Sequence, residues 1–221
     1  MISYLLAMFV VSAVGISYGY MLNDDSEDWF PILEESDFID LKLQLEVLSD
    51  NVKKGEVVVQ KMIADAKKHA VKTIKLSPKE RSLKIEILIK RFINLDFMAR
   101  ATTGSYWKKA TNTQKEKYKS ALLKQIVNTI EEHLNTLATL AYKPLKSEAR
   151  GKKLVYVKGI IKDHSKKIPD VNLLWKLAKD KKGNFLVLDL EIEGISLISS
   201  HKAETMAVSY THLTLPTNRE V

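Results

Sequence analysis

The spacing of apolar residues changes once along this chain, and that change constrains the fold more than any other feature. Up to about Leu140, apolar side chains recur at three- and four-residue steps, which is typical of amphipathic helices. Beyond Leu140 the pattern becomes strand-like, and short turns separate the runs. Helices first and a sheet later predict an α+β fold.

The helical half divides at recognisable start and stop signals. Residues 38–49 can form a short amphipathic helix and residues 56–74 a better one. Ser77 and Pro78 open the next helix, because serine is a good N-cap, proline suits the first helical position, and Glu80 sits at the capping-box position. This helix is expected to run through residue 92.

A glycine and a threonine mark the last helical boundaries. Gly104 interrupts the periodicity, and Thr111 caps a helix that extends to about Leu137. The strands are then expected at residues 141–149, 154–163, 171–179 and 184–191. Short turns between sequential strands predict an antiparallel meander.

The N-terminal region has two features that bear on where the protein works. Residues 5–19 form an uncharged apolar stretch that is short for a bilayer span and suits the core of a signal peptide, with cleavage after Gly19; a retained anchor and a buried helix are the alternatives. Residues 23–50 hold ten acidic residues and one lysine, a net of −9, so the rest of a chain with net charge +8 carries +17. Such a basic body attracts polyanions, either nucleic acid or anionic lipid.

Little in the sequence points to catalysis or to a metal. There is no cysteine, no glycine-rich phosphate loop, and the five histidines lack the spacing of metal ligands. Asp189, Glu191 and Glu193 alternate along the last strand and could share a solvated face, act as acid and base, or hold a metal. The few aromatic residues do not interleave with lysines as in a platform for single-stranded nucleic acid. An enzyme and a cytoplasmic nucleic-acid adaptor remain the alternatives.

Two separated motifs resemble the MlaC/toluene-tolerance family, the soluble auxiliary component of an ABC-type phospholipid transport system. The first comprises Asp96, Phe97, Gly104, Tyr106, Trp107 and Gln114. The second comprises Asp189, Glu193, Gly194 and Ser196, preceded by a strand with Leu173, Leu174 and Trp175. The resemblance covers residues 79–204, with Thr103 and Thr205 as departures from the family pattern.

The resemblance implies a fold and a function. Helices and a curved antiparallel sheet, cone-shaped like nuclear transport factors, would enclose an apolar cavity that holds both acyl chains of a phospholipid. The protein would be a periplasmic carrier without enzymatic activity, cofactor, metal or nucleic-acid partner. Its partners would be an inner-membrane ABC transporter complex and an outer-membrane lipoprotein complex. The alternative is a small enzyme on the same fold that uses Asp189 or Glu193.

Inward strand positions and the facing helix stripe are the expected cavity lining, with Tyr106 and Trp107 as possible rim residues. Within the motifs, Gly194 should allow the turn out of the last strand, and Ser196 should cap the following helix. The predicted lipid-lining residues are Phe92, Phe97, Met98, Tyr106, Tyr118, Leu122, Ile126, Val155, Val157, Leu173, Trp175, Leu186, Leu188 and Ile192.

The end of the chain departs abruptly from the family pattern. Residues 208–221 match one reading frame through a transposase adapter used in sequencing libraries, and they show no helical period. We expect a non-native tail that packs poorly, and a shortened helix after Ser196 that leaves apolar surface uncovered. The expected organisation is therefore a signal peptide (1–19), an acidic segment (20–55), a lipid-binding domain (56–207) and this tail (208–221).

Overall fold

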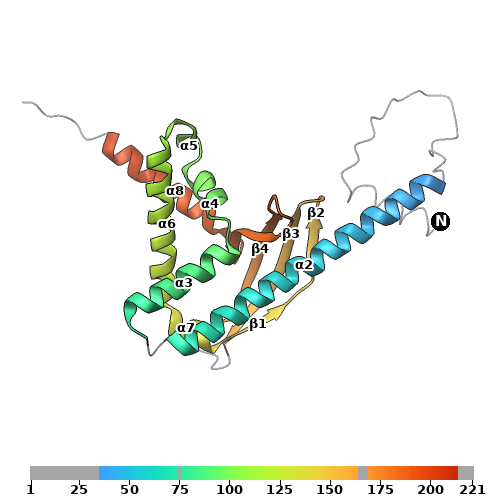
Figure 1. Cartoon of the computed structure of the whole chain (residues 1–221), viewed down its shortest axis with the longest axis horizontal. Coiled ribbons are helices and arrows are strands. Elements are labelled where there is room, and N and C mark those ends of the chain that lie inside the picture. Colours follow the sequence, from blue (N-terminus) through green and yellow to red (C-terminus); the bar gives the residue numbers. More distant parts are fainter. Residues whose placement is uncertain (1–34, 74–75, 164–168, 214–221) are drawn as a thin grey trace, which may run out of the picture.

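Helices occupy the first half of the described chain and strands the second (Figure 1). The computed structural model describes residues 35–73, 76–163 and 169–213. The helices before the sheet are α2 (Glu35–Thr73), α3 (Pro78–Phe92), α4 (Leu95–Thr103), α5 (Tyr106–Lys109), α6 (Asn112–Glu132) and α7 (Leu134–Thr139). The strands are β1 (Leu140–Pro144), β2 (Glu148–Arg150), β3 (Leu154–Asp163), β4 (Val171–Lys179), β5 (Phe185–Ile192) and β6 (Ile195–Ser196), followed by α8 (Leu197–Leu213). The predicted α+β fold is confirmed.

The predicted helix boundaries at the capping residues are present. The Ser77 hydroxyl accepts a hydrogen bond from the backbone N–H of Glu80, whose carboxylate accepts one from the Ser77 N–H. Thr111 and Gln114 form the same reciprocal pair at the start of α6. Gly104 follows α4 with a φ of 57°, in the left-handed region that favours glycine. Short-range chemistry therefore fixes these three boundaries.

Helix α2 is continuous, whereas the pattern predicted two helices over 38–49 and 56–74. The intervening residues stay helical because they pack on the sheet. Asn51 is buried and its Nδ2 donates to the carbonyl oxygen of Lys152, 3.1 Å away. A Cβ at Gly55 would lie 2.8 Å from Val155 Cγ1, so this glycine lets the helix approach β3 closely.

Other predicted elements have different limits. The helix expected to reach Leu137 is divided at His133 into α6 and α7. The strand expected over 141–149 is divided into β1 and β2, because the pairing with β3 shifts by one residue between Pro144, opposite Gly159, and Glu148, opposite Tyr156. Helix α8 continues through Leu213, so the predicted lack of helical structure in residues 208–213 is wrong. Side chains from residue 206 onward, and residues 214–221, lie outside the described part, and the non-native origin of the tail stays a prediction.

The strands form one antiparallel sheet in the order β1-β3-β4-β5-β6, and β2 also pairs with β3. Helix α2 crosses one face of this sheet (Figure 1). Between β4 and β5 the register shifts: Leu177 pairs with Val187, but Lys176 pairs with Asp189. Leu188 is therefore the extra residue of a β-bulge. On β5, the odd-numbered residues before the bulge and the even-numbered residues after it therefore lie on the sheet face that α2 covers.

In the part of the chain that the structure describes, two clusters of buried side chains make up the core. The first lies between α2, the end of α3 and the sheet, and comprises Val59, Met62, Phe92, Val155, Val157, Leu177, Phe185 and Val187. The second joins the end of α2 to α3, α6 and α7, and comprises Ala70, Ile85, Ile89, Val127 and Leu134. Ile93 packs against both clusters and forms a parallel bridge with Val187, so it ties the helices to the sheet.

No helix within residues 35–73, 76–163 and 169–213 is both long and apolar enough to cross a bilayer. The apolar stretch at residues 5–19, and with it the predicted signal peptide, lies outside the described residues.

Candidate functional site

Several predicted lining residues meet beneath α2. Phe92, Val155 and Val157 belong to the first buried cluster, and the half-buried Trp175 packs against it. Val157 and Trp175 are directly opposite each other on β3 and β4, so they share the sheet face that α2 covers. Leu173, two residues before Trp175 on β4, lies on the same face and is buried. This face is apolar as predicted.

Tyr142 of β1 lies at the edge of this face. Its ring covers Gly159 so closely that a Cβ on that glycine would lie 2.2 Å from the nearest ring atom. Burial raises the pKa of the Tyr142 hydroxyl to about 12; the Glu56 carboxylate adds to the rise, and the Trp175 indole opposes it. The hydroxyl is therefore neutral at physiological pH and adds no charge beside the apolar face.

Helix residues of the predicted lining lie on α4 and α6. Leu122 is buried, and Ile126 packs against the second cluster. Met98, like its neighbour Phe97, is half-buried on α4. The Tyr118 hydroxyl donates to Oγ1 of the buried Thr102 at 2.9 Å, which ties α6 to α4. These residues belong to the helical part of the molecule, which meets the buried cluster beneath α2 at Ile93.

The predicted lining residues of β5 do not share one face. Leu186 pairs with Ala178, on the side of the sheet opposite to Val187, whereas Ile192 pairs with Leu173. Leu188 is buried at the bulge between them. Strict alternation placed all three on the inward face, and it fails because the bulge adds one residue to the strand.

A groove of about 370 Å³ opens between α4, α5 and α6. The predicted residues Tyr106, Trp107, Gln114 and Tyr118 line it together with Thr103, Lys109, Ala110 and Lys115. The Lys115 Nζ lies 5.6 Å from the centre of the Trp107 ring, at the distance of a cation–π contact. Tyr106 is 47% exposed, so it presents its ring to solvent.

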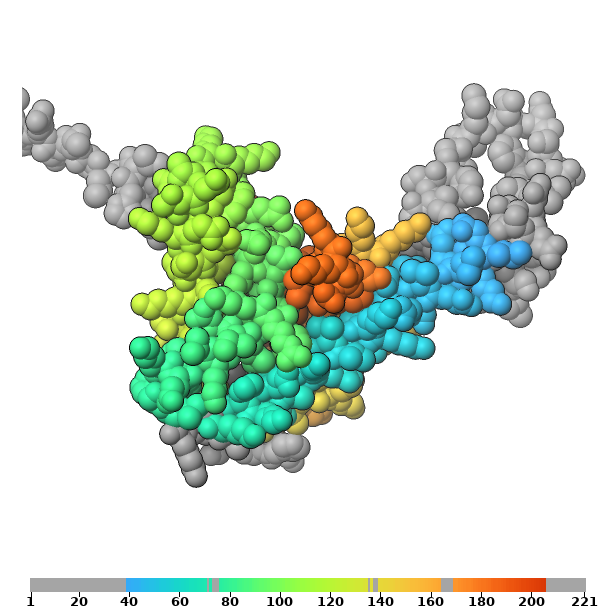
Figure 2. Space-filling model, in the orientation of Figure 1, coloured from blue at the N-terminus to red at the C-terminus, as the bar shows by residue number. Residues whose placement is uncertain are grey.

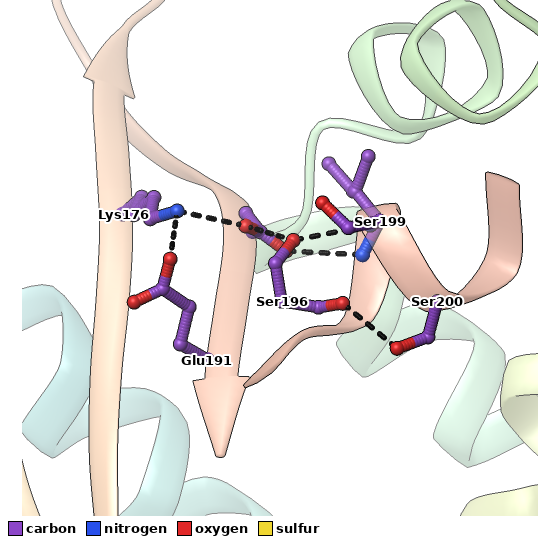
Figure 3. A network of polar contacts seen from close by, with 7 residues as sticks. Lys176, Glu191, Ser196, Ser199 and Ser200 are labelled. Atoms are coloured by element: carbon purple, nitrogen blue, oxygen red, sulfur yellow. Dashed lines mark hydrogen bonds and ion pairs between the residues drawn. The ribbon is translucent and has the colours of Figure 1, made fainter. Parts of the chain in front are cut away.

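The second motif fastens α8 to the sheet (Figure 3). Asp189 is 5% exposed; its Oδ2 accepts a hydrogen bond from Ser196 Oγ at 2.7 Å, and its Oδ1 accepts from the Ile198 N–H at 3.2 Å. Ser196 Oγ also accepts from the Ser199 N–H at 3.1 Å, which confirms the predicted N-cap. These bonds satisfy backbone donors at the start of α8, which the helix itself leaves unpaired.

A lysine that the sequence pattern did not single out completes this network. Lys176 Nζ lies 3.2 Å from Asp189 Oδ2 and also contacts the Glu191 carboxylate. Partial burial opposes the charge of Lys176, but hydrogen bonds to Glu191 and Asp189 outweigh it and raise the pKa of the lysine. Only the register of β4 against β5 could have revealed this lysine, because it lies 13 residues from Asp189 in the chain.

Glu193 and Gly194 form the two-residue turn between β5 and β6. Their φ angles are 50° and 79°, and two successive positive values are typical of a type I′ hairpin. The Glu193 carboxylate accepts hydrogen bonds from the backbone N–H and the side chain of Asn172. The turn at Gly194 is as predicted. The alternative of one solvated face for Asp189, Glu191 and Glu193 is wrong, since Asp189 is buried and Glu193 lies beyond the strand.

The comparisons with known proteins agree with this geometry. A family model described as MlaC protein matches residues 56–208. The chain belongs to the MlaC family. A phospholipid-binding protein from Ralstonia solanacearum, solved in complex with a phospholipid, has the same fold with a TM-score of 0.57 and 18% sequence identity. The match covers 73% of this chain and 88% of that protein. A search of curated proteins finds no match.

The resemblance expected from the motifs is thus confirmed, and the structure separates the roles of the MlaC motif residues. Asp189, Gly194 and Ser196 hold the β5–α8 connection. Gly104 and Gln114 shape the corner between α4 and α6. Asp96, at the start of α4, lies 2.8 Å from Lys119 of α6. Among the described residues of this MlaC family member, no group of three His, Cys, Asp or Glu side chains could hold a metal ion.

Proposed function

We propose that this protein binds a diacyl phospholipid and carries it through an aqueous compartment. The observation that carries the proposal is that the MlaC family model spans residues 56–208, from the second half of α2 through all six strands into α8. The fold shared with a protein that holds a phospholipid supports it. A diacyl lipid has about 30 CH₂ groups, and at ~0.8 kcal/mol each their exposure to water would cost roughly 24 kcal/mol. A carrier must therefore cover the tails.

The acyl chains would lie against apolar side chains that the core leaves half-buried. Trp175 beneath α2, Phe97 and Met98 on α4, and Ile126 on α6 have such surface. The remaining predicted lining residues stay part of the proposal, the buried ones as the core layer behind this surface, except Leu186, whose side chain lies on the opposite sheet face. No catalytic group is needed for this task.

A matched pair of isoleucine variants tests lipid binding. Native mass spectrometry of the purified protein should show one diacyl phospholipid per chain. Ile126→Asp should remove this lipid, because a charge against acyl chains is costly. Ile87→Asp, at a position that is 59% exposed on α3, should retain it. If Ile126→Asp does not fold, Ile126→Trp, which fills the same space with apolar atoms, should reduce the lipid content.

Each outcome addresses a separate part of the proposal. A wild-type protein that never holds lipid would contradict the function. Lipid that is retained in Ile126→Asp, as in the control, would contradict the assignment of the lining and leave the function standing. Leu188→Asp at the bulge provides a second test of the lining, since Leu188 is buried.

We also propose that the carrier works in the periplasm, between an inner-membrane ABC transporter complex and an outer-membrane lipoprotein complex. Family membership supports this setting, and so does the signal-like stretch at residues 5–19. Intact mass analysis of protein from a periplasmic extract should give a mature chain that begins near Tyr20. Soluble protein that retains Met1 would contradict export.

The alternative of an enzyme that uses Asp189 or Glu193 has less support. Asp189 already accepts hydrogen bonds from Ser196 and the Ile198 N–H and pairs with Lys176. The Glu193 carboxylate is held by Asn172. Both carboxylates therefore have structural partners that account for their positions.

A further inference from the structure

The end of the molecule that carries α5 gathers aromatic rings and positive charge. Residues 97–115 include four basic side chains, Arg100, Lys108, Lys109 and Lys115, and no acidic residue. Figures 1 and 2 show this segment in green, where α5 lies beyond α4 and beside one end of α6. Lys108 and Lys109 are exposed and lie in sequence between Tyr106 and Ala110, which both line the groove, and Lys109 lines it as well.

The two carboxylates that flank this segment have their own cation. Lys119 Nζ lies 2.8 Å from Asp96 Oδ1 and 2.8 Å from Glu116 Oε1. The hydrogen bond to Asp96, followed by that to Glu116, raises the pKa of Lys119. Lys119 offsets one of these two negative charges, so the acids leave a single negative charge against the four basic residues between them. The surface around α5 is therefore strongly positive.

The aromatic residues of this surface are amphipathic. Tyr106 and Trp107 open α5, and each combines an apolar ring with a polar N–H or O–H group, which suits the boundary between headgroups and acyl chains. Lys115 lies over the Trp107 ring and keeps its ammonium group beside it. Long lysine side chains can cover apolar surface while the charge stays among phosphates.

We propose that α5 and the groove beside it dock on the surface of an anionic phospholipid bilayer. The surface that we call the docking tip comprises Tyr106, Trp107, Lys108, Lys109 and Lys115. The occupant is expected to be anionic, because the groove lining includes two lysines and no carboxylate. The inference rests on the proposed carrier function, since the two partner complexes lie in membranes and the carrier would load and release its lipid beside a bilayer. The docking tip adjoins α4 and α6, which contribute Phe97, Met98 and Ile126 to the proposed lining.

Vesicle co-sedimentation of the whole chain tests the docking tip. The wild-type protein should bind vesicles of phosphatidylcholine and phosphatidylglycerol and should bind pure phosphatidylcholine much more weakly. Each lysine near an anionic surface contributes about fivefold to partitioning, so the double variant Lys108→Gln/Lys109→Gln should bind roughly 25-fold more weakly. The matched control Lys181→Gln/Lys182→Gln removes the same charge from exposed residues between β4 and β5 and should bind as the wild type does.

The aromatic contribution is tested separately from charge. Tyr106→Ala should weaken the binding that remains at high salt, where lysine contributions are screened. The ring is 47% exposed, so its removal should leave the fold intact, as far-UV circular dichroism can check.

The outcomes distinguish docking from cargo binding. Equal loss of binding in the two double-lysine variants would mean that the overall charge of the protein, and not the docking tip, drives binding. That result would overturn the proposal. A wild-type protein that ignores anionic vesicles would also overturn it, as would one that binds only an acidic protein. Native mass spectrometry should show that Lys108→Gln/Lys109→Gln keeps its lipid. Absence of lipid from all variants, with vesicle binding intact, would contradict the carrier function and leave the docking tip standing.

Discussion

Replacing Asp189 by asparagine tests whether this buried carboxylate holds α8 to the sheet. Its two oxygens accept hydrogen bonds from Ser196 Oγ and the Ile198 N–H, and Lys176 Nζ lies 3.2 Å away. An asparagine keeps one acceptor oxygen but turns an amino group toward the remaining donors. Hydrogen bonds to charged groups contribute about 1.5–3 kcal/mol each. Lys176 retains its contact with Glu191, which limits the penalty for an unpaired charge.

We therefore expect Asp189→Asn to lower the free energy of unfolding by about 2–3 kcal/mol. For a domain of this size, that loss corresponds to a Tm roughly 4–12 °C lower. Ser196→Ala removes one of the same hydrogen bonds and also the acceptor for the Ser199 N–H, at a cost of about 1–2 kcal/mol.

Because Asp189 and Ser196 share one hydrogen bond, the double variant should be less destabilised than the sum of the single variants, by about 1 kcal/mol. Urea unfolding followed by far-UV circular dichroism measures all four proteins. An Asp189→Asn protein within about 0.5 kcal/mol of the wild type would refute the reasoning. Strict additivity of the two changes would refute the shared bond.

Two further predictions concern Tyr142. Gly159→Ala should destabilise the protein by about 1–3 kcal/mol, measured by urea unfolding, because a Cβ would lie 2.2 Å from the Tyr142 ring; an unchanged midpoint would contradict this packing. Burial raises the folded-state pKa of Tyr142 to about 12, so its contribution to stability is complete below the unfolded pKa of about 10 and is lost as pH rises to about 12. Tyr142→Phe should therefore lose less stability than the wild type between about pH 10 and pH 12. Identical dependence of the unfolding free energy on pH in the two proteins would contradict the raised pKa.

Features set by residues close together in the sequence could be predicted. The hydroxyls of Ser77 and Thr111 bind a backbone N–H three residues ahead, so each cap depends on a four-residue segment. Gly104 and Gly194 stand where the backbone takes a positive φ. The change of period near Leu140 marks the start of β1. In each case the interacting groups are neighbours along the chain, and no tertiary information is needed.

Features set by contacts between distant segments could not be predicted. The bulge at Leu188 depends on how β5 pairs with β4, and it moves Leu186 off the face that strict alternation assigned to it. Lys176 reaches Asp189 and Glu191 only in that register. Helix α2 remains continuous through Gly55 because the glycine packs against Val155, a contact across 100 residues of chain.

The two family motifs differ in what their residues can do for function. In the second motif, the side chains of Asp189 and Ser196 make their hydrogen bonds to each other and to the first backbone N–H groups of α8. Their role is therefore to hold α8 to the sheet. In the first motif, Gly104 and Gln114 build a sharp corner between α4 and α6. That corner holds Tyr106, with nearly half of its surface exposed, and a ring of Trp107 that contacts a lysine. The exposed part of the Tyr106 ring adds little to the stability of its own chain, whereas Trp107 is half-buried. The first motif is therefore where a structural frame and the proposed docking tip coincide, and it is the place to separate folding from function by mutation.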